Sequence, residues 1–390
     1  MELKPGIRFQ AVDVLRALTM FLMIFVNDVG SVKYLPHWVD HVEADVDGMG
    51  FADTIFPAFL FIVGLSLPFA LQSRMNKGKS FLSISLYIVL RSAALIVMGF
   101  FHVNSGAYSE AALLPRPVWT ILTTFSFFLI WMDYPKQWSL RKKNLLVTLG
   151  IVLLALLACL YKGGKPGNLH WMRPSWWGIL GIIGWAYLVC AFVYLLSKGK
   201  AFWLGTALVL FFGINLLSHA GLMPFEIWII GDASNETLIM FGVLASLLYV
   251  NWRNALSGRL LAVFSAAGVL LIILGLLVRP FTEGISKINA TPAWVAICAG
   301  ISLLAFALMI FVVELKGKKG WFSSIDAAGT STLTCYLIPY FLYAFFELAG
   351  FWYPDLINTG LIGVLRSFII SFLIILLVRQ MEKRGIRLKI

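Results

Sequence analysis

The chain has 390 residues, of which 60% are hydrophobic and 13% charged, and its mean hydropathy is +0.87. A water-soluble domain cannot bury this much apolar side chain, so these figures exclude the soluble classes and predict an integral protein of the lipid bilayer. The net charge of +12 would suit a nucleic-acid-binding protein. The basic residues lie between apolar runs rather than in a patch of their own, however, so we expect no nucleic acid partner.

Apolar runs recur along the chain, and each approaches the roughly 20 residues that a membrane-spanning helix needs. They fall at 11–29, 51–72, 81–101, 117–134, 145–161, 176–197, 202–221, 236–251, 260–278, 293–313, 326–348 and 359–378. This pattern predicts an all-α polytopic transmembrane bundle of about 10–12 spans, forming one membrane domain over residues 1–390. Alternate loops hold most of the 31 basic residues. The positive-inside rule therefore places both termini in the cytoplasm and the loop after the first run outside.

The first predicted span, VDVLRALTMFLMIFVNDVG, carries polar side chains at both ends. Asp13 and Arg16 are three residues apart, so on a helix they share one face and can pair. Such a pair is either a packing strut or the cytosolic mouth of a ligand channel, in which Arg16 meets a phosphate or carbonyl oxygen. Asn27 and Asp28 follow about 16 Å further along the helix. They either bond the helix end or face a reaction site on the outer side.

The loop after this span, HWVDHVEADVDGMG, contains His37 and His41 among several carboxylates. Neighbouring carboxylates favour the charged form of an imidazole. His41 is therefore a solvated surface residue, a base that takes a proton from an attacking amine or hydroxyl, or a nucleophile that is itself acylated. The DxDG at Asp45–Gly48 is only a fragment of a calcium loop, and no His or Cys spacing predicts a metal site, so we expect no metal.

The second predicted span begins FADTIFPAFLFIVG and places Asp53 near its outer start. Asp53 can cap this helix or line the wall of a cavity. Arg91 and Arg366 lie within later spans, where each is either paired structurally or lines the same channel. His102, at the end of the third run, can contribute to a sugar site on the outer side.

These segments resemble the heparan-alpha-glucosaminide N-acetyltransferase family and its bacterial relatives. The family pattern runs LDxxRGxxxxxMxxVN, then a histidine, then xxDxxFPxFxFxxG, and the chain reads VDVLRALTMFLMIFVND, a histidine-bearing loop and FADTIFPAFLFIVG. The resemblance implies a transmembrane acyltransferase of the bacterial inner membrane. It implies acetyl-CoA as the cytosolic co-substrate and an amine or hydroxyl of an amino sugar or glycan as the acceptor on the outer side.

The same resemblance implies roles for individual residues. Asn27 and His41 correspond to the catalytic pair on the acceptor side, with Asp28 beside them. The chain reads HVEADVDG where the family commonly reads HAxWNG, and His37 is the alternative histidine. We assign the donor side to Asp13, Arg16, Arg91 and Arg366, and the acceptor side to Asp53, His37 and His102.

The rival class is a secondary transporter for a sugar or organic anion, with Asp13, Arg16 and Asp28 as a relay. The concentration of polar residues on one helix pair and its loop favours a reaction centre, because a transporter typically has broken helices in corresponding halves. The sequence leaves open the acceptor, the acyl chain length, an acetyl-histidine intermediate and a homo-oligomer.

Overall fold

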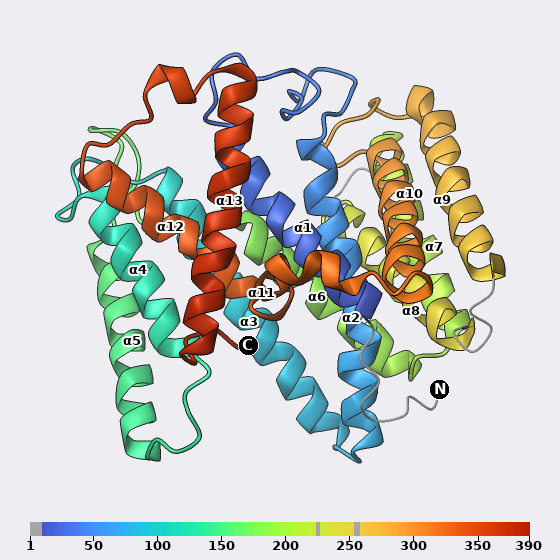
Figure 1. Ribbon diagram of the computed structural model, residues 1–390, viewed down its shortest axis with the longest axis horizontal. Coiled ribbons are helices and arrows are strands. Elements are labelled where there is room, and N and C mark those ends of the chain that lie inside the picture. The colour runs from blue at the N-terminus through green and yellow to red at the C-terminus, as the bar shows by residue number, and fades with distance from the viewer. Residues whose placement is uncertain (1–9, 224–226, 253–257) are drawn as a thin grey trace.

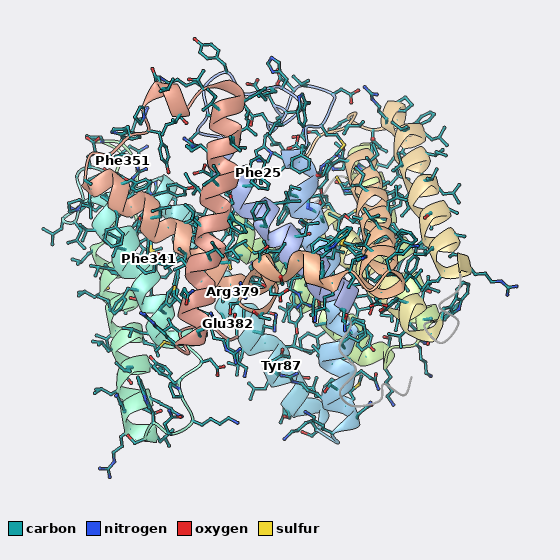
Figure 2. The ribbon with its side chains drawn as sticks, in the orientation of Figure 1. Phe25, Tyr87, Phe341, Phe351, Arg379 and Glu382 are labelled. Carbon is teal, nitrogen blue, oxygen red and sulfur yellow. The ribbon has the colours of Figure 1, made fainter. Side chains whose placement is uncertain are left out.

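The computed structural model describes residues 10–223, 227–252 and 258–390. Within these ranges the regular structure is helical, with isolated β-bridges and no strands (Figure 1). The expected all-α fold is therefore confirmed. Side chains fill the space between the ribbons, and Phe341 of one helix packs on Phe128 of another with ring centroids 5.7 Å apart (Figure 2).

The longer helices correspond one to one with the predicted apolar runs. They are α1 (Gln10–Val29), α2 (Ala52–Asn76), α3 (Phe81–Gly106), α4 (Arg116–Trp131), α5 (Leu140–Leu160), α6 (Gly178–Ser197), α7 (Ala201–His219), α8 (Ser234–Trp252), α9 (Gly258–Val278), α10 (Pro292–Met309), α12 (Thr332–Leu348) and α13 (Gly360–Lys383). Short helical segments are η2 (Arg279–Phe281), η3 (Ile310–Leu315), η4 (Lys319–Ile325), α11 (Asp326–Thr330) and η5 (Asp355–Ile357).

Eight helices in the described part of the chain are long and apolar enough to cross a membrane, against the 10–12 spans expected. They are Ala52–Asn76, Phe81–Gly106, Leu140–Leu160, Gly178–Ser197, Ala201–His219, Gly258–Phe281, Pro292–Leu315 and Gly360–Lys383. The other long helices are α1, α4, α8 and α12. Of these, α4 and α12 are short, with 16 and 17 residues. Charged side chains interrupt α1 at both ends.

Helix α5 starts earlier than its apolar run predicts. The run begins at 145, whereas the helix begins at Leu140, because the Ser139 hydroxyl accepts a hydrogen bond from the Lys142 amide and caps the helix there. An N-cap serine satisfies one of the unpaired amides of the first turn. The basic residues 141–143 are thus helical although they are not apolar.

The predicted run 326–348 is divided into α11 and α12 by a break at Ser331, whose φ and ψ are −123° and 43°. The backbone of Gly329 approaches α1 so closely that a Cβ there would lie 2.8 Å from the Asp13 carbonyl oxygen. Arg16 donates to the Gly329 carbonyl oxygen at 3.4 Å. The polar side chain on α1 therefore helps to satisfy the backbone where the helix is interrupted.

Helices α2 and α8 cross with their backbones in contact. A Cβ on Gly64 would lie 1.9 Å from the Ile239 carbonyl oxygen, and a Cβ on Gly242 would lie 2.0 Å from the Phe61 carbonyl oxygen. Small residues at helix crossings let backbones approach this closely in membrane proteins. Their contact holds α2 in place near its midpoint.

The connections gather at two ends of the bundle (Figure 1). We call the upper end in Figure 1 the His41 end; it includes the connections 30–51, 279–291 and 349–359. We call the lower end, where α2 meets α3 around 77–80, the basic end. Helix α2 runs from one end to the other.

Candidate functional site

Asp53, in the first turn of α2, anchors the loop that precedes this helix. Its side chain is only 1% exposed. One carboxylate oxygen accepts hydrogen bonds from the amides of Val42, at 3.1 Å, and Gly50, at 2.9 Å. The other oxygen lies 2.7 Å from Nδ1 of His41. A buried carboxylate with three donors fixes the loop and the imidazole together.

His41 is oriented by this contact. Because the Asp53 carboxylate accepts, we assign the proton of the neutral imidazole to Nδ1, which leaves a lone pair on Nε2. The His41 side chain is 39% exposed, so the imidazole is partly open to solvent. A histidine held by a buried carboxylate at one nitrogen, with a lone pair on the other, is the arrangement of a general base.

Lys287 completes the cluster, and the sequence analysis missed it. Its Nζ lies 3.0 Å from Nδ1 and 3.3 Å from Nε2 of His41, and 3.9 Å from Oδ1 of Asp53. Burial lowers the pKa of Lys287, and the nearby Asp53 opposes that effect. Lys287 comes from the connection between α9 and α10, and no short-range pattern links it to a histidine 246 positions earlier.

The connections 30–51 and 279–291 are joined by backbone hydrogen bonds and by an ion pair. Arg279 donates to both oxygens of Asp47, at 3.1 and 2.9 Å. The Ile285 amide donates to Asp47 at 2.7 Å, and Gly48 donates back to the Ile285 carbonyl oxygen at 2.9 Å. The Ile285 amide and then Arg279 lower the pKa of Asp47. This junction holds Lys287 against His41.

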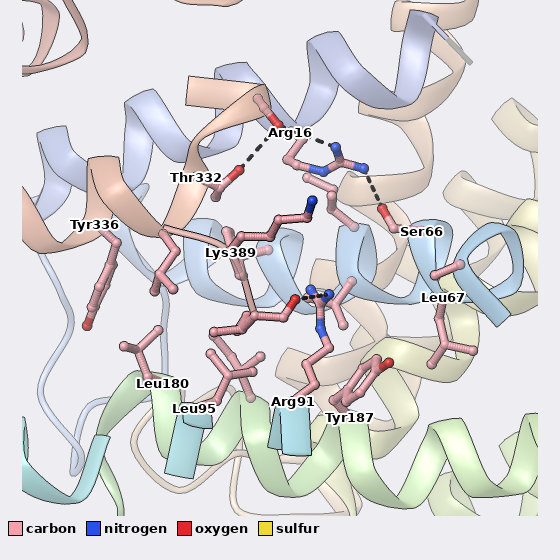
Figure 3. Close-up of a pocket in the computed structure, with 18 of the residues that line it drawn as sticks. Arg16, Ser66, Leu67, Arg91, Leu95, Leu180, Tyr187, Thr332, Tyr336 and Lys389 are labelled. Carbon is pink, nitrogen blue, oxygen red and sulfur yellow. Dashed lines mark hydrogen bonds between the residues drawn. The ribbon is translucent and has the colours of Figure 1, made fainter. Parts of the chain in front are cut away.

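A cavity of about 610 Å³ lies between α1, α2, α3, α6 and the α11–α12 break. Its polar lining includes Arg16, Arg74, Arg91 and Lys389. Figure 3 shows Arg16, Arg91 and Lys389 directed toward one space, with Arg16 bonded to Ser66 at 2.7 Å. The remaining wall is mostly apolar. Four cationic side chains beside an apolar wall suit an anionic ligand with an apolar arm.

The cavity extends along α2 toward His41. Its lining on this helix runs from Arg74 to Phe59, about 22 Å at the rise of an α-helix. Phe59 is six residues, or about 9 Å, from Asp53 along the same helix. The cavity and the His41 cluster therefore follow one another along α2, although neither His41 nor Asp53 is among the residues that line the cavity.

Asp13 and Arg16 form the expected pair, with 3.4 Å between the carboxylate and Nη1. Arg16 and Arg91 both line the cavity, whereas Asp13 is not among its lining residues. Arg91 also donates to the Tyr87 hydroxyl at 3.1 Å.

Asp28 and Arg366 meet in a different place. Arg366 donates to Asp28 at 2.9 Å, and their side chains are 8% and 1% exposed. Tyr343 also donates to Asp28, and the guanidinium lies 4.1 Å from the centre of the Tyr353 ring. Neither Asp28 nor Arg366 is among the residues that line the cavity. The contacts of Arg366 support a structural partner for Asp28 rather than a donor ligand.

The remaining predicted site residues are more scattered. Asn27 is exposed near the end of α1, and His37 is exposed in the following loop. His102 lies inside α3, where its ring stacks on Tyr340 at 3.8 Å and its nitrogens are buried. Within the described ranges, no group of three His, Cys, Asp or Glu residues is arranged to hold a metal ion.

The chain matches a protein family and two curated proteins. The profile of a family described as a domain of unknown function (DUF5009) matches residues 8–226. Heparan-alpha-glucosaminide N-acetyltransferase from Mus musculus is 38% identical over 97 residues, and the Homo sapiens protein is 36% identical over 97 residues. Each match covers 25% of this chain but only 14% of the relative. The resemblance expected from the motifs is confirmed, as that of a distant relative.

Proposed function

We propose that this chain, which belongs to the DUF5009 family, is a membrane-embedded acyltransferase. It transfers an acetyl group from acetyl-CoA to an amine or hydroxyl of an amino sugar or glycan. The observation that carries this proposal is a cavity along α2 lined by four cationic side chains, together with the His41–Asp53 pair at the start of the same helix. The distant similarity to two acetyltransferases supports the same reaction class.

Acetyl-CoA suits the cavity for chemical reasons. Its phosphates need cations, which Arg16, Arg74, Arg91 and Lys389 supply. Its pantetheine arm is thin and largely uncharged, and it can lie against the apolar wall toward Phe59. The thioester then approaches the His41 cluster while the nucleotide remains at the basic end.

The cluster supports direct transfer. Nε2 of His41 accepts the proton of the acceptor amine or hydroxyl as that group attacks the thioester carbonyl. The carbon–sulfur bond then breaks, and the leaving thiolate of CoA takes the proton from the imidazolium. Asp53 stabilises the imidazolium through Nδ1, and Asn27 is proposed to orient the thioester. In the alternative route Nε2 is acetylated first, and an acetylated His41 accumulates when acceptor is omitted.

The distribution of basic residues supports an orientation with the basic end in the cytoplasm and the His41 end outside. In a bacterial inner membrane this places the donor inside and the glycan acceptor outside. Glu43→Cys and Lys77→Cys variants test it. An impermeant maleimide should label the first, but not the second, in intact cells. The reverse labelling would overturn this orientation.

The activity is tested by incubating purified protein in detergent with radiolabelled acetyl-CoA and a panel of amino sugars and glycans. We expect acceptor-dependent release of CoA. His41→Gln should reduce it by a factor of about 100 or more, since a positioned base contributes about 10²–10⁴-fold. His170→Gln, in a different connection, is the matched control. Turnover by His41→Gln at the normal rate would overturn the proposal, as would solute uptake into proteoliposomes without CoA turnover.

A further inference from the structure

The contact between Lys287 and His41 leaves the lone pair of Nε2 able to accept a proton. Nζ lies nearly equidistant from the two ring nitrogens, at 3.0 and 3.3 Å. A donor placed along the Nε2 lone pair at hydrogen-bond distance would be about 5 Å from Nδ1. Lys287 therefore lies beside the ring, and it does not occupy the direction in which Nε2 would accept a proton from a substrate.

The other charges near His41 are mostly negative. Asp53 contacts the ring from α2, and the Asp40 carboxylate accepts from the His41 amide at 2.7 Å. Glu43 and Asp45 follow in the same loop. A carboxylate close to an imidazole favours the imidazolium, which has no lone pair with which to act as a base.

Two further acidic side chains at this end are each engaged by a partner. Asp47 is paired with Arg279, and Glu283 contacts His219. The Lys287 ammonium is therefore a positive charge that opposes the negative charge of Asp53 at the His41 ring. The ammonium is partly shielded from water, because the Lys287 side chain is only 26% exposed.

We infer that Lys287 is a positioning residue for the proposed reaction, whose charge keeps His41 unprotonated and ready to act as a base. The connection 282–291 is thereby part of the active site, although it lies outside the segment that resembles the acetyltransferase motifs. This inference rests on the proposed function. It deepens it by assigning the control of the proton on His41 to a second, distant segment of the chain.

The charge of Lys287 predicts a specific pH effect. A cation at this distance disfavours the imidazolium, so its removal lets His41 hold a proton to higher pH. Lys287→Met should therefore move the acidic limb of the pH–rate profile upward by about one unit or more. At high pH, where His41 is neutral in either protein, the rates should converge. Lys287→Arg keeps the charge and should retain the profile of the wild type.

Two measurements test this inference. The first is the pH dependence of CoA release by the wild type, Lys287→Met and Lys287→Arg, with Lys33→Met as the control, because Lys33 pairs with Asp355 rather than with His41. The second is titration of ¹⁵N-histidine-labelled protein by NMR, with the His41 signal assigned through His41→Gln. We expect the midpoint of the His41 titration to move upward in Lys287→Met and to stay in place in Lys33→Met.

The outcomes separate the inference from the function on which it rests. An equal loss of rate at every pH, with an unmoved His41 titration, would overturn the role of Lys287 while leaving the acyltransferase intact. A wild type without CoA turnover would overturn the function, and the NMR titration would still decide whether Lys287 controls the proton on His41. If Lys287→Met does not fold, Lys287→Gln replaces it, and thermal unfolding confirms that the compared proteins are folded.

Discussion

The buried ion pair between Asp28 and Arg366 joins α1 and α13 near the His41 end, and it allows a quantitative prediction. The two side chains are 1% and 8% exposed. In the variants Asp28→Asn and Arg366→Gln, one charge remains buried without its counterion. Removing one partner of a buried pair costs about 3–5 kcal/mol, whereas removing both is far less harmful.

The expected size can be expressed as a melting temperature. An unfolding entropy of about 2.1 cal/mol/K per residue over 390 residues gives about 0.8 kcal/mol/K. A loss of about 3 kcal/mol then lowers the melting temperature by about 4 °C. If the pair acts as a unit, Asp28→Asn combined with Arg366→Gln should melt above either single variant.

Tryptophan fluorescence of the detergent-solubilised protein during heating measures this cycle. The matched control is the exposed pair of Lys33 and Asp355, with side chains 56% and 75% exposed, for which single variants should change the melting temperature by less than about 1 °C. The structural interpretation of Asp28 is refuted if Arg366→Gln melts like the wild type. It is also refuted if the two single losses simply add in the double variant.

Three further predictions concern other features. Gly64→Ala places a Cβ 1.9 Å from a backbone oxygen and should cost about 1–3 kcal/mol, while Gly213→Ala, with nothing within 4 Å, should be neutral in the same melting assay. Arg91→Gln should raise the KM for acetyl-CoA about tenfold, equivalent to about 1.4 kcal/mol, with little change in kcat. Asp47→Asn should speed hydrogen exchange at the Ile285 amide severalfold at pH 7. Because the folded protein lowers the pKa of Asp47 below 3.8, its contribution is present above that value and is lost as the pH falls through the lowered pKa.

Local sequence patterns predicted the helices well, because a span in lipid must satisfy its own backbone within a contiguous apolar run. The pair of Asp13 and Arg16 was predictable for a similar reason, since residues three apart share a helix face. The break at Ser331 was not predicted. It depends on how closely Gly329 approaches α1, and this approach is a tertiary contact that no hydropathy pattern contains.

The candidate site was predicted only in part. His41 and Asp53 belong to one motif and were identified together, although as separate groups rather than as a hydrogen-bonded pair. Lys287 and the partner of Arg366 were not found, because each contact joins segments hundreds of positions apart. A single sequence contains no signal for such pairs, so charge alone could not distinguish a donor-binding arginine from a structural one.

The backbone contact between Gly64 and Gly242 has a consequence for substrate selection. It clamps α2 between its two functional ends, with Asp53 above it and Arg74 below. This contact fixes the position of α2 against α8, and the rise of the helix then sets the distance between Asp53 and Arg74. In the proposed reaction, a thioester donor would have to match that length. Acetyl-pantetheine, which lacks the nucleotide, would reach His41 without an anchor, and a donor with a longer arm would carry its acyl group past the base.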